Sequence, residues 1–254
     1  MSHSNPHDDI VLTKKEATKA ICEEMPVEFI VNDKKIVTFM ATPQNLNELA
    51  VGYLYSRGLI SEVDDILVLG TCNDMTKVTA RTRTELAQEQ YGLAGVLTSG
   101  CGSGAAVSAA FLKREKIDSN LQITLYQLKA LTKKMFSEAT LYRETGGIHC
   151  AAIANNFCLV TCREDVGRHN AIDKVIGKGL FQGIDFSQHV ILTTGRLSSD
   201  MILKAVAGKI PIVVSRSIPT SLAIEIAEEI GITVVGRIAS FNPIVYTHDW
   251  RIIQ

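Results

Sequence analysis

The stretch HVILTTGRLSSDMILKAVAGKIPIVVSRSIPTSLAIEIAEEIGITVVGRI at residues 189–238 decides the fold. Apolar runs at 189–194 and 211–215 each pass through a short polar turn into a helix-forming segment, and 232–238 adds a further strand. Strands that alternate with helices in this way predict an α/β fold built on a layered sheet core.

Two of the turns in this stretch are candidate anion sites. Gly195–Arg196 and Ser215–Ser217 follow apolar strands and precede helices, where helix N-terminal N–H groups commonly hold phosphates. Two such turns on one sheet edge indicate a nucleotide-like ligand. Neither matches a P-loop or a GxGxxG fingerprint, so a plain strand-to-helix connection is the simpler interpretation of either one alone.

The rest of the chain gives a coarser pattern. A hairpin is expected at 27–31 and 35–41, joined through Asn32–Asp33, and a helix capped by Asn45 is expected to stop at Gly58. Further expected elements are strands at 66–69, 77–83, 149–154 and 158–162, a helix over 125–142, helices from about 198 and over 221–229, and an irregular aromatic tail. We expect an N-terminal tail (1–23), a smaller strand-rich subdomain (24–90) and an α/β domain (91–254).

Composition excludes several function classes. The 254 residues carry 26 basic and 27 acidic side chains, a net charge of −1, which argues against a general nucleic-acid or membrane-surface footprint. The start, MSHSNPHDD, lacks a signal-peptide pattern, and no stretch of about 18 apolar residues occurs. A cytoplasmic location is expected, and the six cysteines are expected to be thiols there.

Cys101 is the sharpest chemical feature. It lies in Ser99-Gly100-Cys101-Gly102-Ser103-Gly104, where flanking glycines let backbone N–H groups converge on one point. Such a turn, followed by a helix N-terminus, would lower the thiol pKa and favour a nucleophilic thiolate. We prefer this interpretation to an inert buried cysteine, because an apolar core does not require glycines on both sides.

The segment REDVGRHNAIDK (163–174) concentrates charge before a helix. Arg168 and His169 could bind a phosphate, or Asp173, one turn after His169, could orient the imidazole for proton transfer. A solvated, salt-bridged helix start is the slightly favoured alternative. No metal site is expected: His149-Cys150 lacks convincing partner ligands, and Cys158 and Cys162 are expected on one face of a strand in the core.

These residues together resemble the FdhD family of formate dehydrogenase accessory sulfurtransferases. The resemblance covers most of the chain and is specific in combination. It is carried by MPVEFIVND, MATPQNLNELAVGYLYSRGLI, TSGCGSG, TGGIHCAA, REDVGRHNAIDKVIG, TTGRLSSDMILKAVAGKIPIVVSRSIPTSLAIEIAEEIGITVVGRI and VYTH.

The resemblance implies a cytidine deaminase-like fold, a homodimer, and Cys101 as the sulfur-carrying cysteine. Sulfur would come from a cysteine desulfurase and pass to the molybdenum or tungsten of bis-molybdopterin guanine dinucleotide, for use by formate dehydrogenase. Deaminase chemistry is not expected, because His149-Cys150-Ala151 stands where a zinc deaminase has His-x-Glu. The expected cofactor-binding residues are Arg168, His169, Arg196, Arg237, Ile238, Ala239, Ser240, Phe241 and Asn242, with Arg216 a further phosphate candidate.

The chain departs from the family pattern in two places. Members often have Cys-Gly-x-Cys where this chain has Cys101-Gly102-Ser103-Gly104, so a relay between two loop cysteines is excluded while a single persulfide carrier stays chemically sufficient. Before VYTH, the run 237–242 contains only one charged residue, Arg237, where the family often has an arginine- and glycine-containing stretch.

The sequence therefore predicts a sulfurtransferase with a Cys101 persulfide. One alternative is a non-catalytic carrier of the guanine dinucleotide cofactor, favoured by the missing second cysteine. A deaminase-like hydrolase is another, and it would require zinc.

Overall fold

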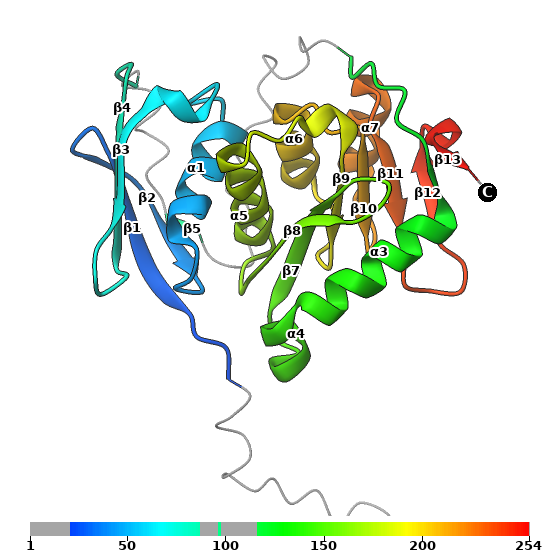
Figure 1. Cartoon of the computed structure of the whole chain (residues 1–254), viewed down its shortest axis with the longest axis horizontal. Coiled ribbons are helices and arrows are strands. Elements are labelled where there is room, and N and C mark those ends of the chain that lie inside the picture. The colour runs from blue at the N-terminus through cyan, green and yellow to red at the C-terminus, as the bar shows by residue number, and fades with distance from the viewer. Residues whose placement is uncertain (1–20, 87–95, 98–115, 254) are drawn as a thin grey trace, which may run out of the picture.

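The molecule is built around two β-sheets with helices packed between and outside them (Figure 1). The computed structural model describes residues 21–86, 96–97 and 116–253. None of the helices within those ranges has the length and apolar character needed to cross a bilayer. The combination of sheets and packed helices confirms a mixed α/β fold. The deaminase-like layering and the three-part division of the chain stay predictions.

The N-terminal sheet has the strand order β3-β4-β1-β2-β5. Its strands are β1 (Met25–Val31), β2 (Lys34–Ala41), β3 (Ile66–Thr71), β4 (Lys77–Thr82) and β5 (Val96–Leu97). The expected β1–β2 hairpin turns at Asn32 and Asp33, whose φ angles of 49° and 64° fit the left-handed conformation that two-residue hairpin turns require. Alternate residues of β1 are fully buried, and they pack against the helix α1 (Leu46–Ser56).

The second sheet has the order β12-β11-β10-β9-β7-β8. Its strands are β7 (His149–Ala154), β8 (Leu159–Asp165), β9 (Val190–Thr193), β10 (Ile212–Ser215), β11 (Thr233–Gly236) and β12 (Ile244–Thr247). Strands β9, β10 and β11 are parallel, as the alternation of strands and helices predicted. Strand β7 is antiparallel to both β8 and β9, so β8 runs in the same direction as β9.

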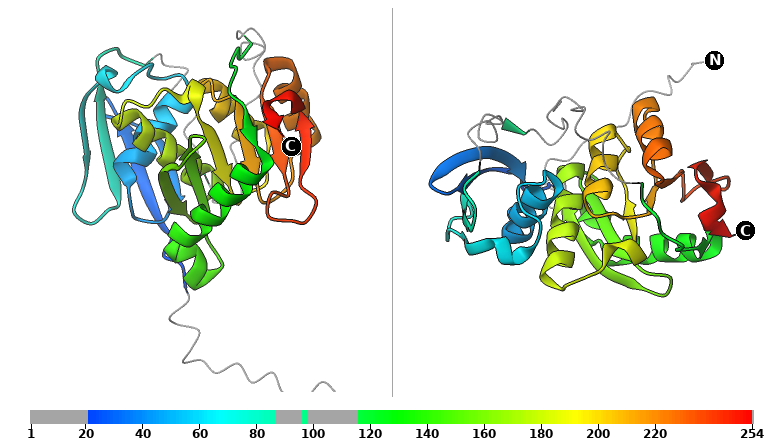
Figure 2. Two further views of the ribbon diagram at one scale, coloured as in Figure 1. Left: turned by 45° about the vertical axis from the view of Figure 1, so that its right-hand side comes forward. Right: turned by 90° about the horizontal axis from the view of Figure 1, so that it is seen from above.

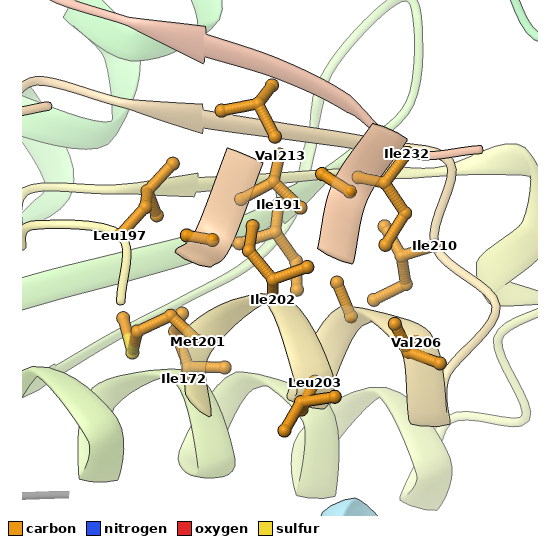
Figure 3. Close-up of a cluster of buried hydrophobic side chains, with 14 of the residues drawn as sticks. Ile172, Ile191, Leu197, Met201, Ile202, Leu203, Val206, Ile210, Val213 and Ile232 are labelled. Atoms are coloured by element: carbon orange, nitrogen blue, oxygen red, sulfur yellow. The ribbon is translucent and has the colours of Figure 1, made fainter. Parts of the chain in front are cut away.

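Helices cover both faces of this sheet (Figure 2). They are α3 (Leu125–Glu138), α4 (Thr140–Thr145), α5 (Arg168–Phe181), α6 (Ser199–Ala207) and α7 (Ser221–Ile230). Figure 3 shows the core under α5 and α6, where Ile191 and Val213 of the sheet meet Ile172 and Ile202. Residues of opposite parity, such as Leu192 and Val214, form a separate core under α3. The three middle strands are therefore apolar on both faces, as expected for a covered parallel sheet.

Helix α5 lies between the two sheets (Figure 1), and nine of its 14 residues are buried. It packs against α1 so closely that a Cβ atom added to Gly52 would lie 1.8 Å from the carbonyl oxygen of Asp173. The reciprocal position, Gly177, would bring a Cβ to 1.9 Å from the carbonyl oxygen of Glu48. Two glycines thus allow the backbones of α1 and α5 to touch.

Several expectations were wrong. The helix expected over 125–142 is two helices, because the backbone leaves the helical region at Ala139, and Glu164 accepts hydrogen bonds from the N–H groups of Leu141 and Tyr142 to start α4. Asn45 is the residue before α1, but its φ of 55° leaves its side chain without a capping hydrogen bond.

The aromatic tail is also more regular than expected. Strand β12 pairs antiparallel with β11, and β13 (Ile252–Ile253) pairs with β6 (Ile123–Thr124), which precedes α3. Short 3-10 turns cover residues 63–65, 186–188 and 249–251. Cys158 is exposed and precedes β8, so the expected pair of core cysteines on one strand is wrong.

Candidate functional site

The candidate site is the edge of the second sheet at which β8, β9, β10 and β11 end. His149, the first residue of β7, pairs with Asp165 at the end of β8, and Thr193 pairs with Ser215, so these ends are level. Each strand end leads into a turn that carries a basic residue, namely Arg168, Arg196, Arg216 and Arg237 in that order. This is the edge at which open α/β sheets bind their ligands.

Each of the four turns contacts the next. The first and second touch because a Cβ on Gly195 would lie 2.7 Å from the Arg168 Cβ. The second and third form a short parallel bridge, in which the N–H of Leu197 donates to the Ile218 carbonyl at 3.1 Å. The third and fourth join where the N–H of Arg237 donates to the carbonyl of Ser217 at 2.9 Å. The edge is therefore one continuous surface with four arginines along it.

His169 is an ionisable group of this edge whose pKa is strongly lowered. Burial, together with the positive charges of Lys204, Arg168 and Arg57, lowers the pKa of His169 to about 3. The imidazole is neutral at physiological pH. Its Nε2 atom is buried and has no hydrogen-bond partner among the described residues. His169 is thus a neutral imidazole with one buried nitrogen that makes no hydrogen bond to the described residues.

His149 lies at the same edge and is held by Thr194. The imidazole Nδ1 is 3.1 Å from the Thr194 hydroxyl oxygen, which also accepts a hydrogen bond from the N–H of Cys150 at 3.1 Å. Burial and the nearby charge of Arg168 lower the pKa of His149. Two neutral imidazoles therefore stand beside Arg168.

Asp173 does not orient His169, although the two residues are one helical turn apart. Its carboxylate accepts two hydrogen bonds from Lys204, both at 2.7 Å, and one from the Ser56 hydroxyl at 2.9 Å. Asp173 is 2% exposed and Lys204 7%, so this helix start is salt-bridged as expected but is not solvated. Asp173 is buried because its partners lie on the covering helices, Ser56 on α1 and Lys204 on α6.

A second buried ion pair holds the turn between β8 and α5. Asp165 and Lys174 have no exposed side-chain surface and lie 2.7 Å apart. Asp165 accepts hydrogen bonds from the N–H groups of Thr42 and Gly167 at 3.2 and 2.8 Å, and from the Asn170 amide at 2.9 Å. Because Thr42 follows β2, this clamp joins the N-terminal sheet to the turn that carries Arg168 and His169.

The expected cofactor-binding residues fall into two groups. Arg168, His169, Arg196 and Arg237 lie at the edge, whereas the loop 238–242 turns toward α3, with Ile238 buried and Phe241 95% exposed. Arg216 is at the edge and donates a hydrogen bond to the Tyr142 hydroxyl. Cys101 lies outside the described residues.

Sequence reasoning missed three members of the edge. Arg57 ends α1 and Lys204 lies on α6, and both act on His169 through their charge. Tyr142 comes from α4. No local pattern marks these side chains, because each reaches the edge from an element distant in the sequence.

The described cysteines differ in reactivity. Burial raises the pKa of Cys150 well above its usual range and that of Cys162 to about 12, so both are held as neutral thiols. Cys158 is exposed, and Cys72 donates a hydrogen bond to Asp74 at 2.7 Å. Within residues 21–86 and 116–253, no three His, Cys, Asp or Glu side chains are grouped as metal ligands.

Comparison with known proteins gives the family. The model of the FdhD/NarQ family matches residues 22–253. Proteins named sulfur carrier protein FdhD from Listeria innocua and Bacillus subtilis are 33% and 36% identical over 250 and 235 residues, covering 94% and 90% of this chain and 94% and 88% of their own. A crystal structure of a formate dehydrogenase accessory protein from Desulfotalea psychrophila superposes with a TM-score of 0.74 at 27% identity, covering 91% of this chain and 90% of that one. Because these matches span nearly the whole length, the chain belongs to the FdhD/NarQ family.

Proposed function

We propose that this protein is a cytoplasmic sulfurtransferase that matures formate dehydrogenase. Cys101 accepts sulfur from a cysteine desulfurase: its thiolate attacks the outer sulfur of the donor persulfide, the new S–S bond forms, and the donor cysteine leaves as a thiolate. The protein then delivers that sulfur to the molybdenum or tungsten of bis-molybdopterin guanine dinucleotide. A homodimer is the proposed working form.

The observation that carries this proposal is the full-length family match to sulfur carrier proteins. The sheet edge adds a physical reason for the anionic substrate. Four arginines follow neighbouring strands, and arginine is well suited to hold pyrophosphate oxygens.

The choice of Cys101 is supported by the state of the other thiols. Sulfur transfer needs a thiolate, and the raised pKa values of Cys150 and Cys162 remove two candidates.

The test is mass spectrometry of peptides after the protein is mixed with a cysteine desulfurase and cysteine. One added sulfur, removed by reductant, is expected on the peptide containing Cys101 and is absent from Cys101→Ser. Cys158→Ser is the matched control, because it removes an exposed thiol and should leave the added sulfur in place.

An unmodified Cys101 beside an active desulfurase would contradict the proposal. If Cys101→Ser also restored formate dehydrogenase activity in cells lacking the native protein, the chain would be a carrier of the dinucleotide cofactor without sulfur transfer.

A further inference from the structure

Helix α7 has a solvent-facing side on which an apolar pair is followed by an acidic pair. The helix lies on the outside of the second sheet (Figure 2). Leu222, Glu225 and Glu229 are exposed and share one side of it, because they are spaced at i, i+3 and i+7. Ile218, in the turn before the helix, is 43% exposed, as is Leu222. We call these four residues the α7 face. The side of α7 that packs on the core consists of Ala223, Ile226, Ala227 and Ile230.

The acidic pair lies where the helix by itself disfavours it. Glu225 and Glu229 are one helical turn apart, and like charges at this spacing repel each other. Glu229 is also in the last turn of α7, where the helix dipole favours cations, and that turn contains no basic residue. Glu228 lies 3.9 Å from the His248 Nε2 atom, whereas Glu225 and Glu229 have no ion-pair partner in the part of the chain that the structure describes. A cationic surface would therefore be attracted to this pair.

The α7 face adjoins the arginine-lined edge of the second sheet. Ile218 belongs to the turn after β10, which also carries Arg216. The Ile218 carbonyl accepts a hydrogen bond from the N–H of Leu197 at 3.1 Å, which joins this turn to the one carrying Arg196. A protein bound to α7 would therefore reach the edge at which the anionic cofactor would be held. The enzyme that receives the cofactor has to approach this same edge.

We propose that the α7 face docks formate dehydrogenase through a basic surface segment of that enzyme. An apolar side chain of the segment packs against Ile218 and Leu222, and its lysine or arginine side chains pair with Glu225 and Glu229. The apolar contact supplies the anchor, and the charge pairs set the orientation and speed the encounter. The proposal rests on the proposed function, since it assigns a docking surface to the enzyme that receives the product.

The test measures binding of the full chain to purified cofactor-free formate dehydrogenase by biolayer interferometry, at about 0.05 and 0.3 M NaCl. Glu225→Lys combined with Glu229→Lys should raise the Kd at least about tenfold at low salt and less at high salt, because salt screens exposed charges. Leu222→Ser should raise the Kd about tenfold at both salt concentrations, because it removes an apolar contact.

Unfolding of the variants is excluded by a second measurement. The double reversal removes the like-charge pair and places cations at the end of the helix, so its urea unfolding midpoint should not fall below that of the native chain. Weaker binding by a protein of undiminished stability then reports on the surface itself.

Two matched controls separate the α7 face from general effects. Glu23→Lys combined with Glu24→Lys makes the same change in net charge at exposed positions before β1. Leu67→Ser removes a leucine that is 59% exposed on β3, in the other sheet. Both controls should bind formate dehydrogenase as tightly as the native chain does.

Three results would overturn the inference. If the α7 variants bind as tightly as the native chain, the face is not the docking surface and the proposed function stands. If they bind normally but lose sulfur loading of Cys101, the face serves the sulfur donor instead. If the native chain does not bind formate dehydrogenase, the maturation part of the proposed function fails as well, whereas sulfur loading of Cys101 is tested separately by mass spectrometry.

Discussion

Removing the charge of Asp165 should destabilise the molecule strongly, because the residue is the centre of the clamp between the two sheets. Asp165→Asn keeps the shape of the side chain but leaves Lys174 as an uncompensated charge with no exposed surface. Breaking a buried ion pair from one side costs about 3–5 kcal/mol. With a urea dependence of about 3 kcal/mol per M, the unfolding midpoint should fall by roughly 1–2 M.

A double-mutant cycle tests the reasoning directly. Lys174→Met combined with Asp165→Asn removes both charges, and the double variant should lose much less stability than the two single losses added together. The matched control is Asp33→Asn, which breaks the ion pair between Asp33 and Arg81. These two side chains are 77% and 61% exposed, so the variant should lose less than about 1 kcal/mol of unfolding free energy. The reasoning is refuted if Asp165→Asn costs no more than this control, or if the double variant shows simple additivity.

Three further outcomes follow from the geometry. Gly52→Ala should lower the free energy of urea unfolding by more than about 2 kcal/mol, because the new Cβ meets a carbonyl of α5. Gly70→Ala is the control: its Cβ would meet nothing within 4 Å, so it should cost less than about 1 kcal/mol. Equal costs for the two variants would contradict the close contact of α1 and α5. The pKa of His169 is lower in the folded than in the unfolded protein, so its contribution to stability is full above about pH 6.5 and falls as the pH drops toward 3. The native chain should lose about 2 kcal/mol of unfolding free energy from this group between pH 7.5 and 5, and His169→Gln should not show that part of the loss. The same pH slope in both proteins would contradict the burial of His169 as a neutral group. Brief iodoacetamide treatment should alkylate the exposed Cys158 and spare Cys150 until urea is added, because Cys150 is buried and its pKa is raised. Rapid labelling of Cys150 in the folded protein would argue against both properties.

The sheet was predictable because its signals are local. The runs at 189–194 and 211–215 are short and apolar on both faces, which identifies them as buried strands. The segments that follow them are longer and repeat apolar residues with helical spacing, which identifies them as helices. The hairpin at Asn32–Asp33 has a turn signal of the same local kind. The strand at 244–247 was missed because it has only four residues and is half exposed, which leaves a weak pattern.

The site was predictable only in part. The sequence identified Arg168, His169 and the strand-end turns, since their position follows from the topology of a parallel sheet. It did not predict that the charges after β8 are buried, because their partners Thr42 and Ser56 lie more than 100 residues away in the sequence. The contact of loop 238–242 with α3 was missed for the same reason.

The same long-range contacts bear on how the chain folds as it is synthesised. Ser56 bonds to Asp173, a partner 117 residues later, and the face of α1 that contains Gly52 is covered by α5. At about 5–20 residues per second, the ribosome needs roughly 6–23 s to make that intervening stretch. The strands β3 to β5 are made early in that interval, and for the rest of it the surface of α1 that faces α5 has no partner and stays open to water once it leaves the tunnel. Arrival of α5 is thus the event that completes the N-terminal half, and slowing translation between residues 56 and 173 would lengthen the period in which chaperones can bind it.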